Sequence, residues 1–400
     1  MALNRISKIR IINGLKGFFY KKVSSIVHAC NNHLAKDQGK PFTIKHRVIR
    51  FIGQLSTLLL SFPNIDTFSI SHKLGMVIVV GDAFRANLIN KLLSDGLDTG
   101  VDNLGRSSVL RLPGLTEGWF SNGAQMVVCS LSPIFPLQFT SPYVITSPSF
   151  IRQVLELPDE INCLLEKPEM RRIRRQLNRA QRFGFKSQFC KSKQDFDFYY
   201  WKMYIPYIQN RFGDTAVLES YEVQFQEFLR GGLILVMRSG VPISGMLTRI
   251  LDNNCYYINV GVLESDLHLL DEGLFSYNLW ELIKWGHQLG ARWVDFGGSF
   301  AFQSDGVFQY KSNWGAEIFS SRFAIEELVF LMNEPSSEFI DCMNNKGIIH
   351  QHQGKFYQAH FFNNPLDHLD PDLDKQLRIA KRNNLSGLVI VSPFSKRYVA

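Results

Sequence analysis

Hydrophobic and polar residues recur with the periods of helices and strands along most of this chain, most clearly from residue 151 to residue 325. Residues 151–157 alternate as in a strand, and residues 170–182 place their apolar side chains on one helical face that ends at Gly184. The predicted elements are strand 151–157, helix 170–182, strand 185–190, helix 195–210 with a kink at Pro206, helix 220–229, strands 233–237, 243–250 and 256–263, helix 272–289, strand 293–296, a short helix around Lys311 and a last strand.

This order predicts an α/β (α+β) fold with a mixed sheet and flanking helices. Antiparallel strands come first, and a right-handed strand–helix–strand connection then adds a parallel strand. Upstream, the pattern predicts a smaller α/β unit, and downstream it weakens. The upstream and downstream predictions are strand 75–80, helix 83–94, strand candidates 109–112 and 125–128, a loop or edge region over 132–149, and a late strand at 388–391.

We therefore divide the 400-residue chain into four parts. They are a basic leader at 1–62, an α/β unit at 63–150, the main domain at 151–325 and a C-terminal extension at 326–400.

Charge is concentrated at the start of the chain. Residues 1–50 hold 11 Lys or Arg against one acid, Asp37, whereas the other 350 residues carry 33 basic and 35 acidic side chains. The basic balance therefore belongs to the leader and is no signature of whole-protein nucleic-acid binding. Interpreted functionally, the leader is an amphipathic anchor on an anionic membrane surface; interpreted structurally, it is a basic helix packed on the body or a frayed end.

Two further patterns limit location and chemistry. The longest uncharged run, 118–151, holds six Ser and four Pro and predicts no membrane-spanning helix, and no signal-peptide pattern follows the N-terminus. The expected location is cytoplasmic, with the leader at the inner face of the membrane. The six Cys and ten His form no metal-ligand spacing, so we expect no metal, and the thiols are expected to be buried and reduced.

Five motifs in the main domain belong together. They are Arg171-Arg172-x-Arg174-Arg175 with Arg182-x-Gly184, Tyr204-x-x-Tyr207-x-x-x-Arg211-x-Gly213, the glycine-bounded hairpin around 240–245, Asp295-x-Gly297-Gly298-Ser299, and Gly306-Val307-x-x-Tyr310-Lys311-x-x-Trp314-Gly315. Together they resemble the FemAB-like branch of the GNAT (acyl-CoA N-acyltransferase) superfamily, over about 155 residues. The unit at 63–150 is then the degenerate first half that this branch often carries, or a cap.

The resemblance implies transfer of an acyl group to an amine without a covalent enzyme intermediate. It does not choose the donor: acyl-CoA is one option, and an aminoacyl-tRNA is the alternative. The implied acceptor is a sugar or peptide amine of a cell-envelope precursor. It also implies a phosphate- or carboxylate-binding role for Lys311 and substrate contacts for the motif residues Tyr207, Arg211, Gly297, Gly298, Ser299 and Trp314. A non-catalytic scaffold on the same fold stays open.

The donor site is predicted where helix 272–289 begins. Its free backbone N–H groups suit a pyrophosphate, and Gly273, between Glu272 and Leu274, lets a phosphate approach the backbone. Asp271 and Glu272 are ordinary N-cap residues, but they repel a diphosphate. In strand 256–263, Gly261 indicates a bulge or a splay that frees the backbone of Val262 and Leu263 for a pantetheine arm, or is an ordinary strand glycine.

Three side chains are candidates for the chemistry. Asp295, which leaves its strand before two glycines, is a general base or a brace for the turn. Tyr310 is a general acid toward the leaving thiolate or a core residue. Lys311 has the site role that the resemblance implies, whereas its spacing alone indicates only an exposed lysine.

The helix at 170–182 is unusually rich in arginine. Its six guanidiniums have only Glu169 nearby as an i,i+4-type partner. This composition indicates a polyanionic partner at Arg171, Arg172, Arg174 and Arg175, or a basic face neutralised by counterions or by acids from another domain.

Overall fold

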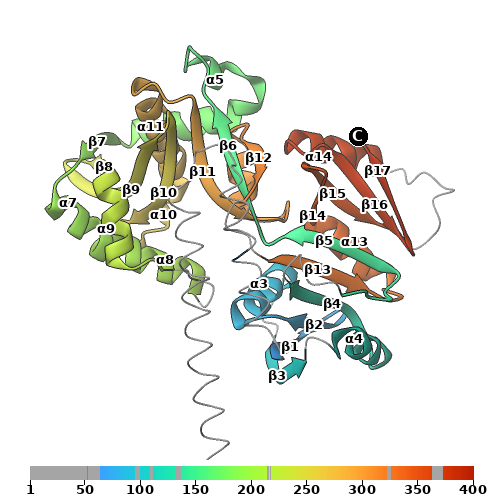
Figure 1. Ribbon diagram of the computed structural model, residues 1–400. Coiled ribbons are helices and arrows are strands. Elements are labelled where there is room, and N and C mark those ends of the chain that lie inside the picture. The colour runs from blue at the N-terminus through green and yellow to red at the C-terminus, as the bar shows by residue number, and fades with distance from the viewer. Residues whose placement is uncertain are drawn as a thin grey trace, which may run out of the picture.

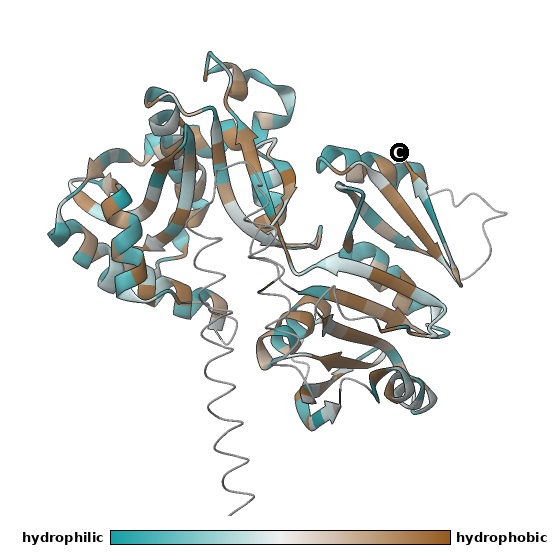
Figure 2. Ribbon diagram, in the orientation of Figure 1, coloured by the Kyte–Doolittle hydropathy of each residue, from teal (hydrophilic) through white to brown (hydrophobic). Residues whose placement is uncertain are grey.

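The computed structural model describes residues 52, 64–94, 100–108, 111–131, 137–213, 216, 218–321, 326–362 and 373–400. The leader, apart from Ile52, lies outside these residues. The described chain forms three β-sheets, with the seven-stranded sheet in one lobe and the other two in the second lobe (Figure 1). Hydrophobic residues follow the strands, and hydrophilic residues gather on the outer faces of the helices (Figure 2). No described helix is both long and apolar enough to span a bilayer.

The seven-stranded sheet is built from the main domain. Its order is β12 (Glu317–Ser320), β6 (Phe150–Glu156), β11 (Trp293–Phe300), β10 (Asn254–Val262), β9 (Val241–Leu251), β8 (Gly231–Arg238) and β7 (Lys186–Cys190). All neighbours are antiparallel except β10 and β11, which α11 (Leu274–Gln288) connects. The predicted mixed sheet with flanking helices is therefore confirmed.

Helix α11 lies along β7, and side chains two residues apart in the strand meet side chains four residues apart in the helix. Phe185, Ser187 and Phe189 point to one side, two residues apart, as Tyr277, Glu281 and Trp285 do at four-residue helical spacing. The ring centroids of Phe185 and Tyr277 are 5.9 Å apart and those of Phe189 and Trp285 are 4.8 Å apart, and the Ser187 hydroxyl donates to Glu281 at 2.7 Å. Before β7, α6 (Arg171–Arg182) packs against α11.

The predicted helix 195–210 is three joined segments. These are α7 (Lys193–Phe198), a π-helical turn (Tyr199–Tyr204) and α8 (Ile205–Phe212), and α9 (Tyr221–Arg230) follows. The predicted kink at Pro206 is replaced by the wide turn just before it. Because Pro206 has no N–H, the carbonyl one turn earlier loses its usual helical donor, and a π-turn relieves the clash with the ring.

The second lobe combines the predicted α/β unit with part of the C-terminal extension. Its six-stranded sheet has the order β3 (Val101–Ser108), β1 (Asn64–His72), β2 (Gly75–Val80), β4 (Ala124–Leu131), β13 (Glu327–Met332) and β5 (Tyr143–Pro148), with α3 (Ala83–Leu93) and α4 (Leu112–Ser121). The described half of the strand candidate 109–112 is wrong, because Leu112 opens α4 with Pro113 in the first turn, where proline is favoured.

The remaining C-terminal elements form the third sheet. It contains β14 (Ile349–His352), β15 (Lys355–Phe361), β16 (Gly387–Ser392) and β17 (Ser395–Val399), with α13 (Ser337–Lys346) and α14 (Leu373–Arg382). The strand predicted at 388–391 is confirmed as β16.

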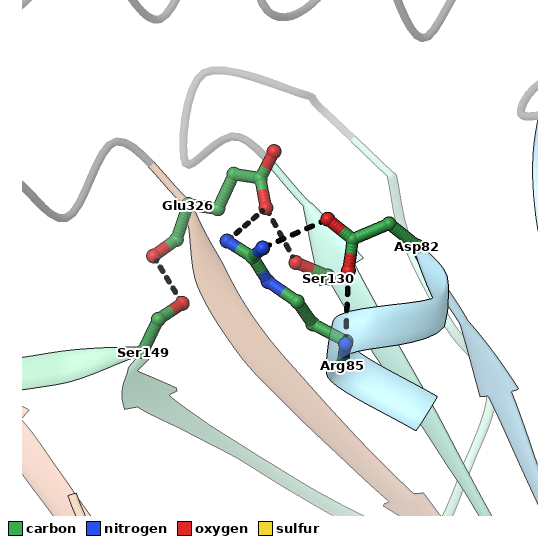
Figure 3. A network of polar contacts seen from close by, with 5 residues as sticks. All are labelled: Asp82, Arg85, Ser130, Ser149 and Glu326. Atoms are coloured by element: carbon green, nitrogen blue, oxygen red, sulfur yellow. Dashed lines mark hydrogen bonds and ion pairs between the residues drawn. The ribbon is translucent and has the colours of Figure 1, made fainter. Parts of the chain in front are cut away.

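A polar network fastens the two places where the chain passes between lobes (Figure 3). Ser149 lies between β5 and β6, and its hydroxyl donates to the carbonyl of Glu326, just before β13, at 2.9 Å. The Glu326 carboxylate accepts from Ser130 at 2.6 Å and faces Arg85 at 3.2 Å, and Arg85 also pairs with Asp82 at 2.8 Å. The network therefore links the ends of β2 and β4 to the two segments that connect the lobes.

We expect Glu326→Ala to lower the free energy of unfolding by about 1 kcal/mol, because it removes one charged acceptor that is partly exposed to solvent. Urea denaturation followed by circular dichroism measures the change. The control is Glu317→Ala, on an exposed side chain of β12. Equal losses in the two variants would contradict a stabilising role for the network.

Candidate functional site

The strands β10 and β11 separate in the middle of the seven-stranded sheet. They pair over three positions only, the last joining Tyr256 to Asp295. Beyond that point β10 stays paired with β9 as far as Val262, and β11 stays paired with β6 as far as Phe300. We call this divergence the strand opening. In the second lobe, the corresponding parallel pair β2–β4 stays paired to Val80, the last residue of β2.

Bulges on both strands produce the strand opening. In β10 the register shifts between Tyr257 and Asn259, so Ile258 is the extra residue. In β11 it shifts between Asp295 and Gly298, where Gly297 has a φ of +76°. The splay predicted in β10 is thus present, but its bulge lies at Ile258 and not at Gly261.

Four side chains lie beside the strand opening, namely Tyr207, Arg211, Tyr257 and Tyr310. Burial raises the pKa of the Tyr257 phenol, whose charged or titratable neighbours include Tyr207, Arg211 and Tyr310. A Cβ on Gly297 would lie 3.7 Å from the Tyr257 ring. Arg211 donates to the Tyr207 hydroxyl, and its guanidinium lies 5.2 Å from the ring centroid of Phe275 in the first turn of α11. Tyr207, Arg211 and Tyr310, which the motifs include, therefore lie around Tyr257, which belongs to no motif.

Asp295 is buried, with 4% of its surface exposed, and both of its oxygens have partners. Oδ1 accepts the Gly297 N–H at 2.8 Å, and Oδ2 lies 3.1 Å from Nε of Arg152 on β6. The first contact is the brace that an Asp before two glycines predicts. The ion pair with Arg152 was not predicted, since 142 residues separate the two along the chain.

Lys311 is buried on α12 (Gly306–Ser312), with 6% exposed, and its Nζ donates to the Gly298 carbonyl at 2.6 Å. Burial lowers the Lys311 pKa to about 8, against the opposing effects of Asp295 and Asp305. Spacing alone predicted an exposed lysine, and that expectation is wrong. The amine therefore changes protonation near neutral pH.

Tyr310 precedes Lys311 and faces the start of α11. Its hydroxyl lies 3.2 Å from the Ser276 hydroxyl, and burial raises its pKa to about 12. The phenol is thus protonated at neutral pH, as a proton donor must be.

A buried hydrogen-bond chain fixes α12 against the strands. The Ser299 hydroxyl donates to Gln153 at 2.7 Å, and the Gln153 amide donates to the Ser312 hydroxyl at 2.9 Å and to the Phe308 carbonyl at 3.1 Å. Ser299 therefore supports the site from the core. Trp314 is also fully buried, and its ring centroid lies 6.4 Å from that of Trp280.

The predicted donor side is crowded by the protein's own backbone. A Cβ on Gly261 would lie 2.5 Å from the Tyr204 nitrogen in the π-helical turn, so glycine is needed there for close packing. The Gly261 carbonyl accepts the Ser244 hydroxyl at 2.8 Å, and Val262 is fully buried while Leu263 packs against the core.

The start of α11 is similarly packed. Gly273 has a φ of +94°, and a Cβ on it would lie 2.3 Å from the Gln176 carbonyl of α6. Glu272 pairs with Arg238 at 2.7 Å, the carbonyl of Asp271 accepts from Arg179 at 2.6 Å, and Leu274 is fully buried. The acidic charge of Glu272 next to α11 is thus partly neutralised.

The four arginines of α6 that are candidates for anion binding divide into two groups. Arg174 donates to the carbonyls of Leu165 and Lys167. Arg171, Arg172 and Arg175 are exposed, and within the described ranges none of them has an ion pair. Arg172 is close enough to Tyr310 to lower the pKa of that phenol.

Groups that could hold a metal and reactive thiols were sought in the part of the chain that the structure describes. It contains no group of three or more His, Cys, Asp or Glu able to hold a metal. Burial raises the pKa of Cys129 to about 12 and of Cys190 to about 11, which suppresses the reactive thiolate.

Comparisons with known proteins give distant structural likenesses. No model of a known protein family matches the chain, and no curated protein matches it. A domain described as the C-terminal part of a lysylphosphatidylglycerol synthetase from Agrobacterium fabrum is 9% identical, with a TM-score of 0.35, over 78% of this chain and 92% of that one. FemX is 14% identical, with a TM-score of 0.34, over 66% and 83%. A GCN5-related N-acetyltransferase from Sphaerobacter thermophilus is 13% identical, with a TM-score of 0.29, over 66% and 74%.

Proposed function

We propose that this protein is an N-acyltransferase that moves an acyl group from acyl-CoA to an amine of a cell-envelope sugar or peptide precursor. One observation carries the proposal: β10 and β11 part after three paired positions, and Lys311 and the Gly297–Gly298 bulge of β11 lie beside the parting. A parallel pair that diverges leaves backbone N–H and C=O groups free to bind an extended arm. No such parting occurs between β2 and β4.

The proposed reaction is a direct displacement. The amine nitrogen attacks the thioester carbonyl, the new C–N bond forms, and the C–S bond breaks after a tetrahedral intermediate. The attacking amine loses one proton, and the departing thiolate gains one. Backbone N–H groups freed on β10 would stabilise the oxyanion, and each well-placed donor contributes about 3 kcal/mol in such sites.

We assign the proton transfers to the two adjacent residues of α12. With a pKa of about 8, Lys311 is partly neutral at physiological pH and can accept the proton of the amine. Tyr310, held by Ser276, is the proposed donor to the thiolate. Asp295 is a poorer base, since both of its oxygens are engaged and its ion pair favours the carboxylate.

A second donor class has its own supporting observation. The exposed arginines Arg171, Arg172 and Arg175 lack ion pairs within the described chain, which suits a polyanion such as an aminoacyl-tRNA. The packing of α6 against Gly273 also leaves less room for a diphosphate at that point. A scaffold without any donor is the third option.

Titration calorimetry with acetyl-CoA tests the proposal. We expect saturable heat with the full chain. We also expect tighter binding by Asp271→Gln, because removing a carboxylate beside the start of α11 lowers repulsion of the diphosphate. The control is Asp252→Asn, in the turn between β9 and β10. Absence of heat at millimolar ligand in both the wild type and Asp271→Gln would remove acyl-CoA as the donor.

A further inference from the structure

Arg152 is a partly buried cation that belongs to none of the five motifs. It lies on β6 between β11 and β12, and its side chain is 15% exposed. Its register partner on β11 is Gly298, and its guanidinium lies 5.9 Å from the ring centroid of Phe319 on β12. Its charged contact is Oδ2 of Asp295, at 3.1 Å from Nε.

A chain of contacts leads from Arg152 to Lys311. The second oxygen of Asp295 accepts the N–H of Gly297 at 2.8 Å, at the left-handed residue of the β11 bulge. The next residue, Gly298, receives the Lys311 ammonium on its carbonyl at 2.6 Å. One carboxylate oxygen therefore lies beside the cation, in an ion pair in which Nε of Arg152 makes no hydrogen bond within the described residues, and the other is hydrogen-bonded to the bulge of β11 that positions the amine. Without the cation, the negative charge of Asp295 is no longer balanced from β6, and Lys311 lies within its electrostatic reach.

We propose that Arg152 is a positioning residue of the candidate site: it holds the Asp295 carboxylate on the Gly297–Gly298 bulge of β11 and away from the Lys311 amine. This rests on the proposed function only in giving Lys311 a role in proton transfer. The arrangement itself concerns the protein without substrate.

The sign of the expected effect follows from the groups that face Lys311. These are Asp295 from β11 and Asp305 at the start of α12, both of which favour the ammonium, while burial opposes it. Arg152 on β6 neutralises Asp295. Removing the guanidinium leaves a full negative charge beside the amine and raises the Lys311 pKa.

NMR titration of the full chain labelled with isotopes at the lysine side chains measures this directly, with Lys311→Arg to assign the signal. We expect Arg152→Met to raise the titration midpoint of Lys311 by about one pH unit, the size of effect that an unopposed charge at this range produces. Arg152→Lys, which restores the cation, should return the midpoint toward the wild-type value.

The background Asp295→Asn separates positioning from simple loosening. If Arg152 acts through Asp295, Arg152→Met should shift the midpoint much less when residue 295 is already neutral. Water entering a loosened core would raise the midpoint equally in both backgrounds, and that result would overturn the proposal. An unchanged Lys311 midpoint in Arg152→Met would also overturn the proposal. So would a midpoint in Arg152→Lys that is as high as the midpoint in Arg152→Met.

The matched control is Arg249→Met, which breaks the ion pair between Arg249 of β9 and Glu227 of α9, at 2.6 Å. It should leave the Lys311 midpoint unchanged. If Arg152→Met does not fold, Arg152→Lys and Asp295→Asn still test the proposal. We expect Asp295→Asn to lower the Lys311 midpoint, and an unchanged midpoint in that variant would contradict the charge coupling. No substrate enters this measurement, so its failure is distinct from failure of the acyltransferase proposal.

Discussion

Lys311→Met is expected to reduce turnover by about 100-fold or more, the usual contribution of a general base. In the wild type, turnover should rise with pH through about 8, because the Lys311 pKa is lowered to about 8 and the neutral amine is the active form. In the variant, only the rise that comes from deprotonation of the acceptor amine itself should remain. The measurement is release of free CoA from acetyl-CoA across pH 6 to 10, with glucosamine and lysine-containing dipeptides as acceptors.

Loss of packing at a buried lysine must be separated from loss of the base. Lys346 offers the comparison, since it is also buried, at 8% exposed, but lies on α13 in the other lobe. Lys346→Met should keep both the rate and the pH dependence. Turnover that is unchanged in Lys311→Met, or a pH profile of unchanged shape, would refute the role given to Lys311.

Local periodicity made the main sheet predictable, and long-range pairing limited the rest. Each strand of 151–325 follows its own hydrophobic pattern, so the order and the parallel step at α11 were within reach. The intercalation of β13 between β4 and β5 was not, because no local pattern states which sheet a strand joins. The π-helical turn before Pro206 was missed because a helical period describes α- and π-turns almost equally over six residues.

In the candidate site, too, local motifs identified some residues, whereas others are brought in only by long-range strand pairing. Motifs identified Tyr207, Arg211, Asp295 and Lys311, and these four do gather near the strand opening or directly behind it. Arg152 and Tyr257 belong to no motif, and only the register of β6 against β11 and the bulge at Ile258 bring them in. The one available signal for Arg152 was a basic residue inside strand 150–156, a strand that also contains Gln153 and Glu156.

A glycine in the sequence indicates that another group approaches the backbone closely, but not whether that group is protein or ligand. At Gly273 a substitution can distinguish packing against α6 from binding of a phosphate. Gly273→Ala should lower the free energy of unfolding by about 3 kcal/mol, from the left-handed backbone and from the clash with Gln176. Gly290→Ala is the matched control at the other end of α11: its φ is +73°, but nothing lies within 4 Å of the added Cβ. It should cost about 1 kcal/mol, from the backbone alone. Chemical denaturation without any ligand measures both values. A loss in Gly273→Ala no larger than in Gly290→Ala would show that α6 yields at Gln176, and the glycine would then be explained better by a bound phosphate than by packing.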